Sequence, residues 1–146
     1  HFGVSNFLPN QFNLLQSHLD FSLVTNQIEV SVLNLEHFDN GNIDFLQERK
    51  ISPMVWSPFA GGRMFLENSE QANRVRNVLN EIAYKYQVGI DAVAAAWLLV
   101  HPVNFNVVLG SGKIDRIKSS LKGLEIKLTR EEWFKLWVAS KGYDVP

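Results

Sequence analysis

Small polar side chains follow four short apolar segments of the chain, at the points where each segment is predicted to end as a strand. These four ends span residues 3–6, 25–29, 55–59 and 108–113. In α/β architectures, ligands bind where strands end and the following loops begin. Taken alone, each end could be simple turn or helix-cap chemistry. Because the pattern occurs four times, it predicts one wall of a small-molecule site.

Three of these polar side chains suit a ligand that carries an amide. Ser5, Asn6 and Gln27 offer both hydrogen-bond donors and acceptors, which is the complement of a carboxamide. Trp56 precedes the polar residues of the third end and offers an aromatic face that could stack on a planar ring.

The fourth end is rich in glycine and resembles a phosphate-binding loop without matching the P-loop. The motif G-x-x-x-x-G-K-[ST] requires glycine at position 107 and Ser or Thr at position 114, where this chain has Val107 and Ile114. Glycines before a helix still let backbone N–H groups approach a phosphate, and Lys113 and Arg116 would add positive charge. The alternative is that these two cations form a solvated helix face.

A second glycine-rich segment follows the third strand. Residues 61–63, Gly-Gly-Arg, could wrap a pyrophosphate or form only a flexible loop. The Rossmann fingerprint G-x-G-x-x-G follows none of the predicted strands, which argues against a Rossmann dinucleotide site.

No side chain stands out as a catalytic proton donor or as part of a metal site. The histidines fall in different predicted elements, and they are His1, His18, His37 and His101. Glu36 and His37 are expected to form a loop pair. Tyr84 and Tyr86 lie on one periodic helix. The expectation is therefore no catalytic residue and no metal ligand in this chain.

Length and composition indicate one globular domain, residues 1–146, from a reducing compartment. A net charge of −1 argues against binding to nucleic acid or to an anionic membrane. The absence of cysteine fits a cytoplasmic location. The apolar run at residues 92–100 is far shorter than the roughly 20 residues of a membrane helix. No basic region precedes an apolar stretch at the start, so no signal peptide is visible.

Strand and helix patterns alternate along the chain. Strands are expected at residues 2–4, 23–30, 53–56 and 106–109, and helices from position 9, at 43–50, 71–86, 91–100 and 113–121, and after a capping box at 129–132. Trp97, Trp133 and Trp137 are expected to pack between helices. Such alternation predicts parallel strands joined by right-handed crossovers, in an open doubly wound sheet or in part of a (βα)8 barrel. Because a complete barrel takes roughly 250 residues, four units would be about half of one.

The whole chain resembles the C-terminal half of the aldo-keto reductases, from their fifth barrel strand to the end. The resemblance rests on residues 3–7, 26–29, 56–62, 96–99 and 110–116. The loop at 110–113 and the ending at 142–146 are most similar to a branch of bacterial oxidoreductases. The resemblance to this family implies an α/β fold, the C-terminal half of a (βα)8 TIM barrel. It also implies an NADP(H)-dependent oxidoreductase that reduces aldehydes or ketones to alcohols.

The resemblance also implies a role for each strand end in binding NADP(H). Ser5, Asn6 and Gln27 would hold the nicotinamide carboxamide, and Trp56 would stack on its ring. The pyrophosphate would be lined by Ser57, Phe59, Gly61 and Gly62, and the 2′-phosphate of the adenosine would be faced by Ser111, Lys113 and Arg116. Three differences from the family stand out: Trp56 for the usual Tyr, Gly110 for a frequent Lys, and Ser119-Ser120 for a frequent Glu-Asn. The last two weaken the expected 2′-phosphate and adenine contacts.

The catalytic Tyr, Lys, Asp and His of the family belong to its first four strands, which this sequence does not contain. Because hydride transfer needs a proton donor near the carbonyl oxygen, the chain is expected to be inactive alone. The chain starts within a predicted strand, which is expected to mark the loss of the catalytic half. A half barrel exposes two sheet edges, so the expected partner is the N-terminal half of the barrel or a second copy of the chain. Two alternatives remain open: a non-catalytic half-barrel module that homodimerises, and a nicotinamide-binding regulatory subunit.

Overall fold

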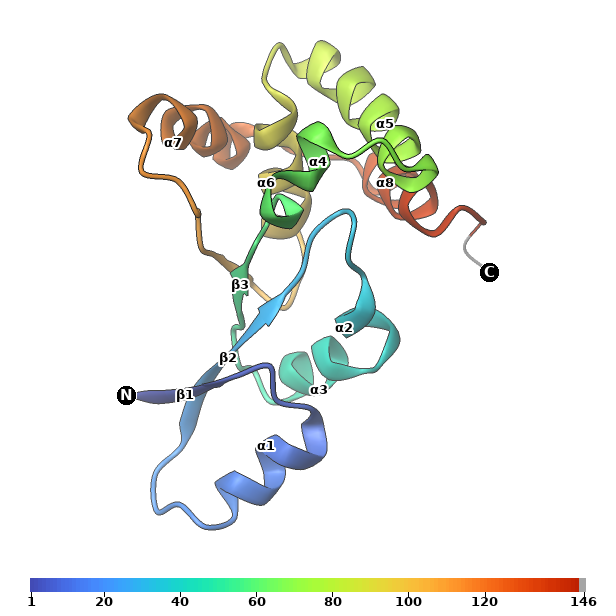
Figure 1. Ribbon diagram of the computed structural model, residues 1–146. Helices are drawn as coiled ribbons and strands as arrows, with labels where there is room; N and C mark the ends of the chain where they lie inside the picture. The colour runs from blue at the N-terminus through green and yellow to red at the C-terminus, as the bar shows by residue number, and fades with distance from the viewer. Residues whose placement is uncertain (145–146) are drawn as a thin grey trace.

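Four parallel strands form one sheet and pair in the order in which they occur in the chain (Figure 1). The computed structural model describes residues 1–144. The strands are β1 (Phe2–Ser5), β2 (Leu23–Glu29), β3 (Met54–Trp56) and β4 (Asn106–Val107). Of the ending compared with bacterial oxidoreductases, Val145 and Pro146 lie outside the described residues. The predicted α/β class with parallel strands is confirmed.

Helices connect the strands and continue beyond the last one. They are α1 (Pro9–Gln16), α2 (Glu36–Asp39), α3 (Asn42–Glu48), α4 (Arg63–Leu66), α5 (Glu70–Tyr86), α6 (Ile90–Leu99), α7 (Ile114–Leu121) and α8 (Arg130–Lys141), with the short 3-10 helices η1 (Ala60–Gly62) and η2 (Lys122–Glu125). The segment 61–63 was expected to be a loop, but it lies in η1 and at the start of α4. Within the described part of the chain, no helix is long and apolar enough to cross a membrane.

The two faces of the sheet differ in burial. Ile28 in β2 and Val55 in β3 are fully buried and belong to the main hydrophobic core, which also contains residues of α5 and α6. Gln27, Glu29 and Trp56 point to the opposite face, because side chains alternate along a strand, and they are only half-buried. One face of the sheet therefore packs on helices, and the other carries polar and aromatic side chains.

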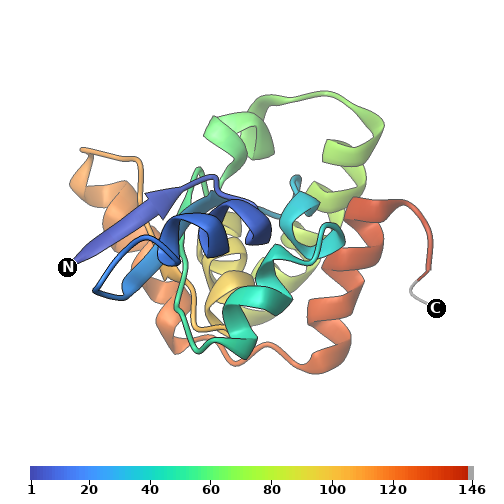
Figure 2. The same ribbon diagram turned by 90° about the horizontal axis from the view of Figure 1, so that it is seen from below.

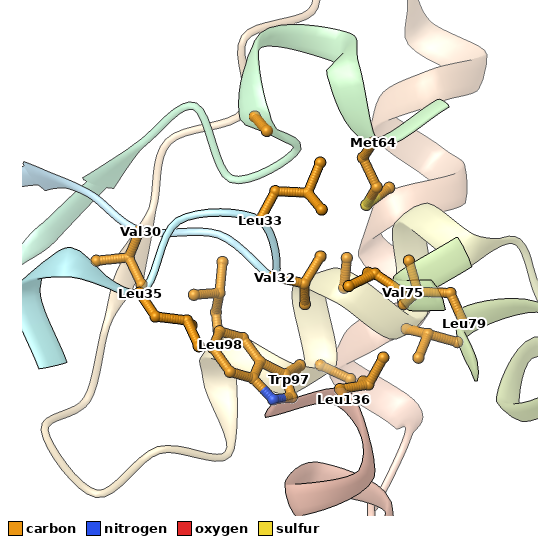
Figure 3. Packing of buried hydrophobic residues seen from close by; sticks show 14 of the residues in the cluster. Val30, Val32, Leu33, Leu35, Met64, Val75, Leu79, Trp97, Leu98 and Leu136 are labelled. Atoms are coloured by element: carbon orange, nitrogen blue, oxygen red, sulfur yellow. The ribbon is translucent and has the colours of Figure 1, made fainter. Parts of the chain in front are cut away.

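The core fills the space between the end of β2 and the helices that follow β3 (Figure 3). The segment after β2 contributes buried Val32, α5 contributes Leu79, and α8 contributes Leu136. In α6, Trp97 is 1% exposed and stacks on Trp133 of α8, with 5.1 Å between ring centroids. Each of these indoles donates its N–H to the other residue's backbone carbonyl, at 3.2 and 3.0 Å. The reciprocal bonds satisfy both indole donors and fix α6 against α8.

The predicted capping box at the start of α8 is present, and it also joins two helices. The Thr129 hydroxyl accepts from the Glu132 backbone N–H at 3.2 Å, while the Glu132 carboxylate accepts from the Thr129 N–H at 2.9 Å. The same carboxylate accepts from Lys85 Nζ and Tyr86 Oη at the end of α5. Figures 1 and 2 show α5 and α8 side by side, with the two chain ends on opposite sides of the molecule.

The close contact between η2 and α6 allows a test of the packing. A Cβ added at Gly123 would lie 2.6 Å from the Ala92 carbonyl oxygen and 3.0 Å from Ala95 Cβ. We expect Gly123→Ala to lower the free energy of unfolding by roughly 1–3 kcal/mol, because backbone and core atoms must shift. Urea unfolding measures this. Gly112→Ala is the matched control, since a Cβ there meets no atom within 4 Å, and its stability should stay within about 0.5 kcal/mol of the wild type. Equal stabilities for the two variants would contradict the packing.

Candidate cofactor-binding site

The first two strand ends are joined by hydrogen bonds to one carbonyl group. Ser5 of β1 lies opposite Gln27 of β2 in the parallel register. The Gln27 carbonyl oxygen accepts from the Ser5 hydroxyl at 3.1 Å and from the Asn6 backbone N–H at 2.9 Å. These bonds fix the turn that leaves β1, and they bring together the three residues that the sequence assigns to a carboxamide.

Trp56 reaches this turn from the end of β3. Its indole Nε1 donates to Asn6 Oδ1 at 3.1 Å. Asn6 has a φ of 56°, a left-handed conformation in which only a few per cent of non-glycine residues occur. With Oδ1 accepting from the indole, the Asn6 amide nitrogen is oriented as a donor for another group. A planar aromatic face and an oriented amide thus lie together at the strand ends.

A groove of about 720 Å³ lies beside the third and fourth strand ends. Six of the residues predicted from the sequence line it: Ser57, Phe59, Gly61, Gly62, Ser111 and Arg116. Its size is within the usual range of small-molecule sites. The structure therefore divides ten of the eleven predicted residues into two sets, one joined at the strand ends and one along the groove. Their role in binding stays a prediction.

The segment that follows β3, most of which lines the groove, has an unusual backbone conformation. Ser57, Ala60, Gly61 and Gly62 all have positive φ, with values of 50°, 52°, 62° and 91°. A Cβ added at either glycine would meet no atom within 4 Å, so the backbone borders open space there. Such strain at non-glycine positions persists only where the surroundings enforce it, and it concentrates at functional sites.

The charges along the groove are mixed. Arg116 lines it, but the carboxylates of Asp91 and Asp115 line it too. Lys113, which the sequence also assigns to the 2′-phosphate, is exposed at the N-cap of α7 and is not among the lining residues. The structure thus brings one of the two predicted cations to the groove.

Sequence reasoning missed Asp91 as a lining residue of the groove. Its two carboxylate oxygens accept from the hydroxyls of Ser119 and Ser120, each at 3.0 Å. These two serines occupy the positions where the chain differs from the Glu-Asn of many family members. That difference was visible in the sequence, but the distant acid that the serines bind was not.

Glu36 and His37 do not form the expected loop pair. They lie in α2, where His37 is buried and its Nδ1 lies 3.1 Å from Asn42 Nδ2 of α3. The short helix was missed because four residues are too few to show a helical period. Within residues 1–144, no cluster of three or more His, Asp or Glu side chains could hold a metal ion.

Comparisons with known proteins show the family to which the chain is similar. The profile of the Aldo/keto reductase family matches residues 1–138. The chain is 42% identical to the uncharacterized oxidoreductase YcsN of Bacillus subtilis and 42% identical to the oxidoreductase YdhF of Escherichia coli, in each case over 100% of this chain and 49% of the relative. It is also 42% identical to a 6-dehydroglucose reductase of Agrobacterium fabrum, over 98% of this chain and 47% of the relative.

Solved structures show the same relation. The thermostable aldo-keto reductase Tm1743, solved with the inhibitor epalrestat, superposes with a TM-score of 0.81 at 25% identity and covers 95% of this chain and 47% of its own. A Bombyx mori aldo-keto reductase in complex with NADP gives a TM-score of 0.75 at 25% identity, over 95% of this chain and 43% of its own. The chain spans about half the length of the relatives it matches.

The fold and these matches define the class: an α/β chain that corresponds to half of a (βα)8 barrel. The chain belongs to the aldo-keto reductase family, as its strand-end motifs predicted.

Buried His37 and half-buried His101 predict how stability depends on pH. Burial lowers the pKa of His37, against the opposing effect of Glu36 and Glu29, and burial likewise lowers the pKa of His101, against Asp44. The unfolded chain, in which a histidine has a pKa near 6.5, therefore binds protons more readily than the fold does. We expect stability to be fully present above about pH 6.5 and to fall as the pH drops through the lowered folded values.

Urea unfolding at about pH 7.5 and about pH 5.5 measures this dependence. The variants His37→Gln and His101→Gln should each lose less stability between these two pH values than the wild type does. A variant that keeps the full wild-type difference would show that its histidine is not a source of the pH dependence.

Proposed function

We propose that this chain supplies the cofactor-binding half of an NADP(H)-dependent oxidoreductase that reduces aldehydes or ketones to alcohols. The proposal places the carbonyl-reducing site at the carboxyl ends of β1 to β4. The partner that completes the barrel would be the N-terminal half of the same fold. A cytoplasmic location fits a chain without cysteine.

The main support for the proposal is the hydrogen bond between Trp56, at the end of β3, and Asn6, which follows β1. Trp56 Nε1 donates to Asn6 Oδ1, which leaves the Asn6 amide as a donor next to an aromatic face. Nicotinamide combines a planar ring with a carboxamide, so it matches both features. Gln27 lies one register position away and adds a second amide.

The groove suits the remainder of a dinucleotide. Gly61 and Gly62 let the backbone approach a pyrophosphate closely, because no Cβ stands between them and the ligand. Arg116 is the cation along the groove that would meet a phosphate. The neighbouring carboxylates of Asp91 and Asp115 oppose this charge, so preference for NADP over NAD rests on Arg116 and on the exposed Lys113.

When bound, NADPH supplies the hydride. The residues of this chain would orient the nicotinamide through Asn6, Gln27 and Ser5, and Trp56 would cover one face of the ring. The proton for the carbonyl oxygen would come from the other half of the barrel, where the family carries its catalytic residues.

Tryptophan fluorescence tests the proposed nicotinamide contact. We expect NADPH to quench the emission of Trp56, and Trp56→Ala to weaken NADPH binding about two- to tenfold, since an aromatic stack contributes about 0.5–1.5 kcal/mol. Trp137→Phe is the matched control, because Trp137 lies in the aromatic cluster between helices. That variant loses emission but should keep the quenching and the affinity. Unchanged quenching in Trp56→Ala would contradict the stack.

Activity of the isolated chain tests whether catalysis depends on the other half of the barrel. The 146-residue chain, purified alone, should not oxidise NADPH in the presence of aliphatic or aromatic aldehydes, because it lacks the proton donor. The native protein, with any sequence that precedes His1, should do so. Turnover by the isolated chain at the rate of the native protein would overturn the assignment of catalysis to the other half. A native protein that begins at His1 would instead favour the non-catalytic half-barrel module or the regulatory subunit.

A further inference from the structure

A buried asparagine side chain forms hydrogen bonds to the main-chain groups of the residue that follows Asn6. Asn26, in β2, is 0% exposed. Its Nδ2 donates to the Phe7 carbonyl oxygen at 2.7 Å, and its Oδ1 accepts from the Phe7 backbone N–H at 3.3 Å. One amide thus satisfies both main-chain groups of Phe7, and the chain is held immediately after the residue that contacts Trp56.

A second buried asparagine acts on the same carbonyl from another element. Asn42, the first residue of α3, is 0% exposed, and its Nδ2 donates to the Phe7 carbonyl oxygen at 2.9 Å. The other hydrogen of this amide is directed to His37 Nδ1 at 3.1 Å. Nδ1 must therefore accept, which requires a neutral imidazole with its proton on Nε2.

In this arrangement one buried polar atom has no hydrogen-bond partner. Among residues 1–144, Asn42 Oδ1 is the buried side-chain atom that lacks a hydrogen-bond partner. Turning the amide over would give this oxygen a position near the histidine, but it would place an oxygen against the Phe7 carbonyl. Since an orphaned buried acceptor destabilises a fold, the chain gives up stability to keep the donor on Phe7.

Phe7 follows Asn6 directly in the chain, so the buried side chains that bond Phe7 hold the residue next to Asn6. Asn6 has its strained left-handed φ, its N–H is bound to Gln27, and its side chain accepts from Trp56. A strained residue keeps its conformation only when its neighbours determine it. On one side the neighbours are the strands, and on the other they are the two buried asparagines.

We propose that Asn26, Asn42 and His37 are positioning residues, which hold the Phe7 peptide and thereby set Asn6 and Trp56 for the nicotinamide end of the cofactor. This inference rests on the proposed function. If the three residues only stabilised the fold, their loss would affect all parts of the cofactor alike. If they position Asn6, their loss would affect the nicotinamide half and leave the adenosine half, which the groove would bind, unchanged.

The variant Asn42→Leu separates these two outcomes in the native protein. Leucine keeps the branched shape of the side chain at Cγ but removes the donor to Phe7. We expect binding of NADPH to weaken about tenfold, as for the loss of roughly 1.4 kcal/mol, and binding of 2′,5′-ADP to stay within about twofold. Isothermal calorimetry with both ligands measures this. Ile43→Val is the matched control, because Ile43 is the next residue of α3, is buried, and has an apolar side chain that donates no hydrogen bond. Both affinities should be unchanged in this control.

A measurement without ligand distinguishes the positioning role from the proposed function. In protein with ¹⁵N-labelled tryptophan, the indole N–H resonance of Trp56, assigned from Trp56→Phe, should shift in Asn42→Leu and stay in place in Ile43→Val. If Asn42→Leu does not fold, His37→Phe removes the acceptor for the Asn42 amide and should give the same pattern. Equal weakening of both ligands, or an unmoved Trp56 resonance, would overturn the positioning role. Failure of the wild type to bind either ligand would overturn the proposed function instead, and the resonance would still decide the positioning role.

Discussion

The parallel pairing of each strand with its neighbour in sequence is the constraint on which the rest of the structure depends. In the order β1-β2-β3-β4, every connection returns the chain to the same end of the sheet. Because such crossovers are right-handed, their helices lie on one face. The carboxyl ends of all strands then meet at one edge, so residues as far apart as Asn6 and Trp56 reach hydrogen-bond distance.

The helices that cover one face of the sheet are joined to one another by hydrogen bonds. Trp97 and Trp133 exchange hydrogen bonds between α6 and α8, and Glu132 joins the start of α8 to the end of α5. Burial of these groups on the outer face leaves the inner face with half-buried Gln27 and Trp56. The edge strands β1 and β4 bound a sheet whose chain superposes on 47% of the solved aldo-keto reductase Tm1743.

The sequence predicted the features that depend on local pattern. The strands, the long helices and the capping box follow from periodicity and residue type, and the strand-end motifs identified the family. Local pattern does not reveal pairs that only the fold brings together. Asp91 meets Ser119 and Ser120 from another helix, and Asn42 meets Phe7 across 35 positions. A four-residue helix such as α2 is likewise too short for a period, so His37 was expected in a loop.

The two ends of the candidate site are held by different physical means. At the strand ends, Asn6 is bonded to Gln27 and Trp56, and the Phe7 peptide that follows it is bonded to the buried amides of Asn26 and Asn42. Little conformational freedom therefore remains to be lost on binding. Along the groove, the backbone at Gly61 and Gly62 borders open space, and Arg116 is exposed. Under the proposed function, the preorganised end would hold the nicotinamide ring, whose orientation determines hydride transfer. The more open end would bind the phosphates, which tolerate small shifts because their recognition is mainly electrostatic.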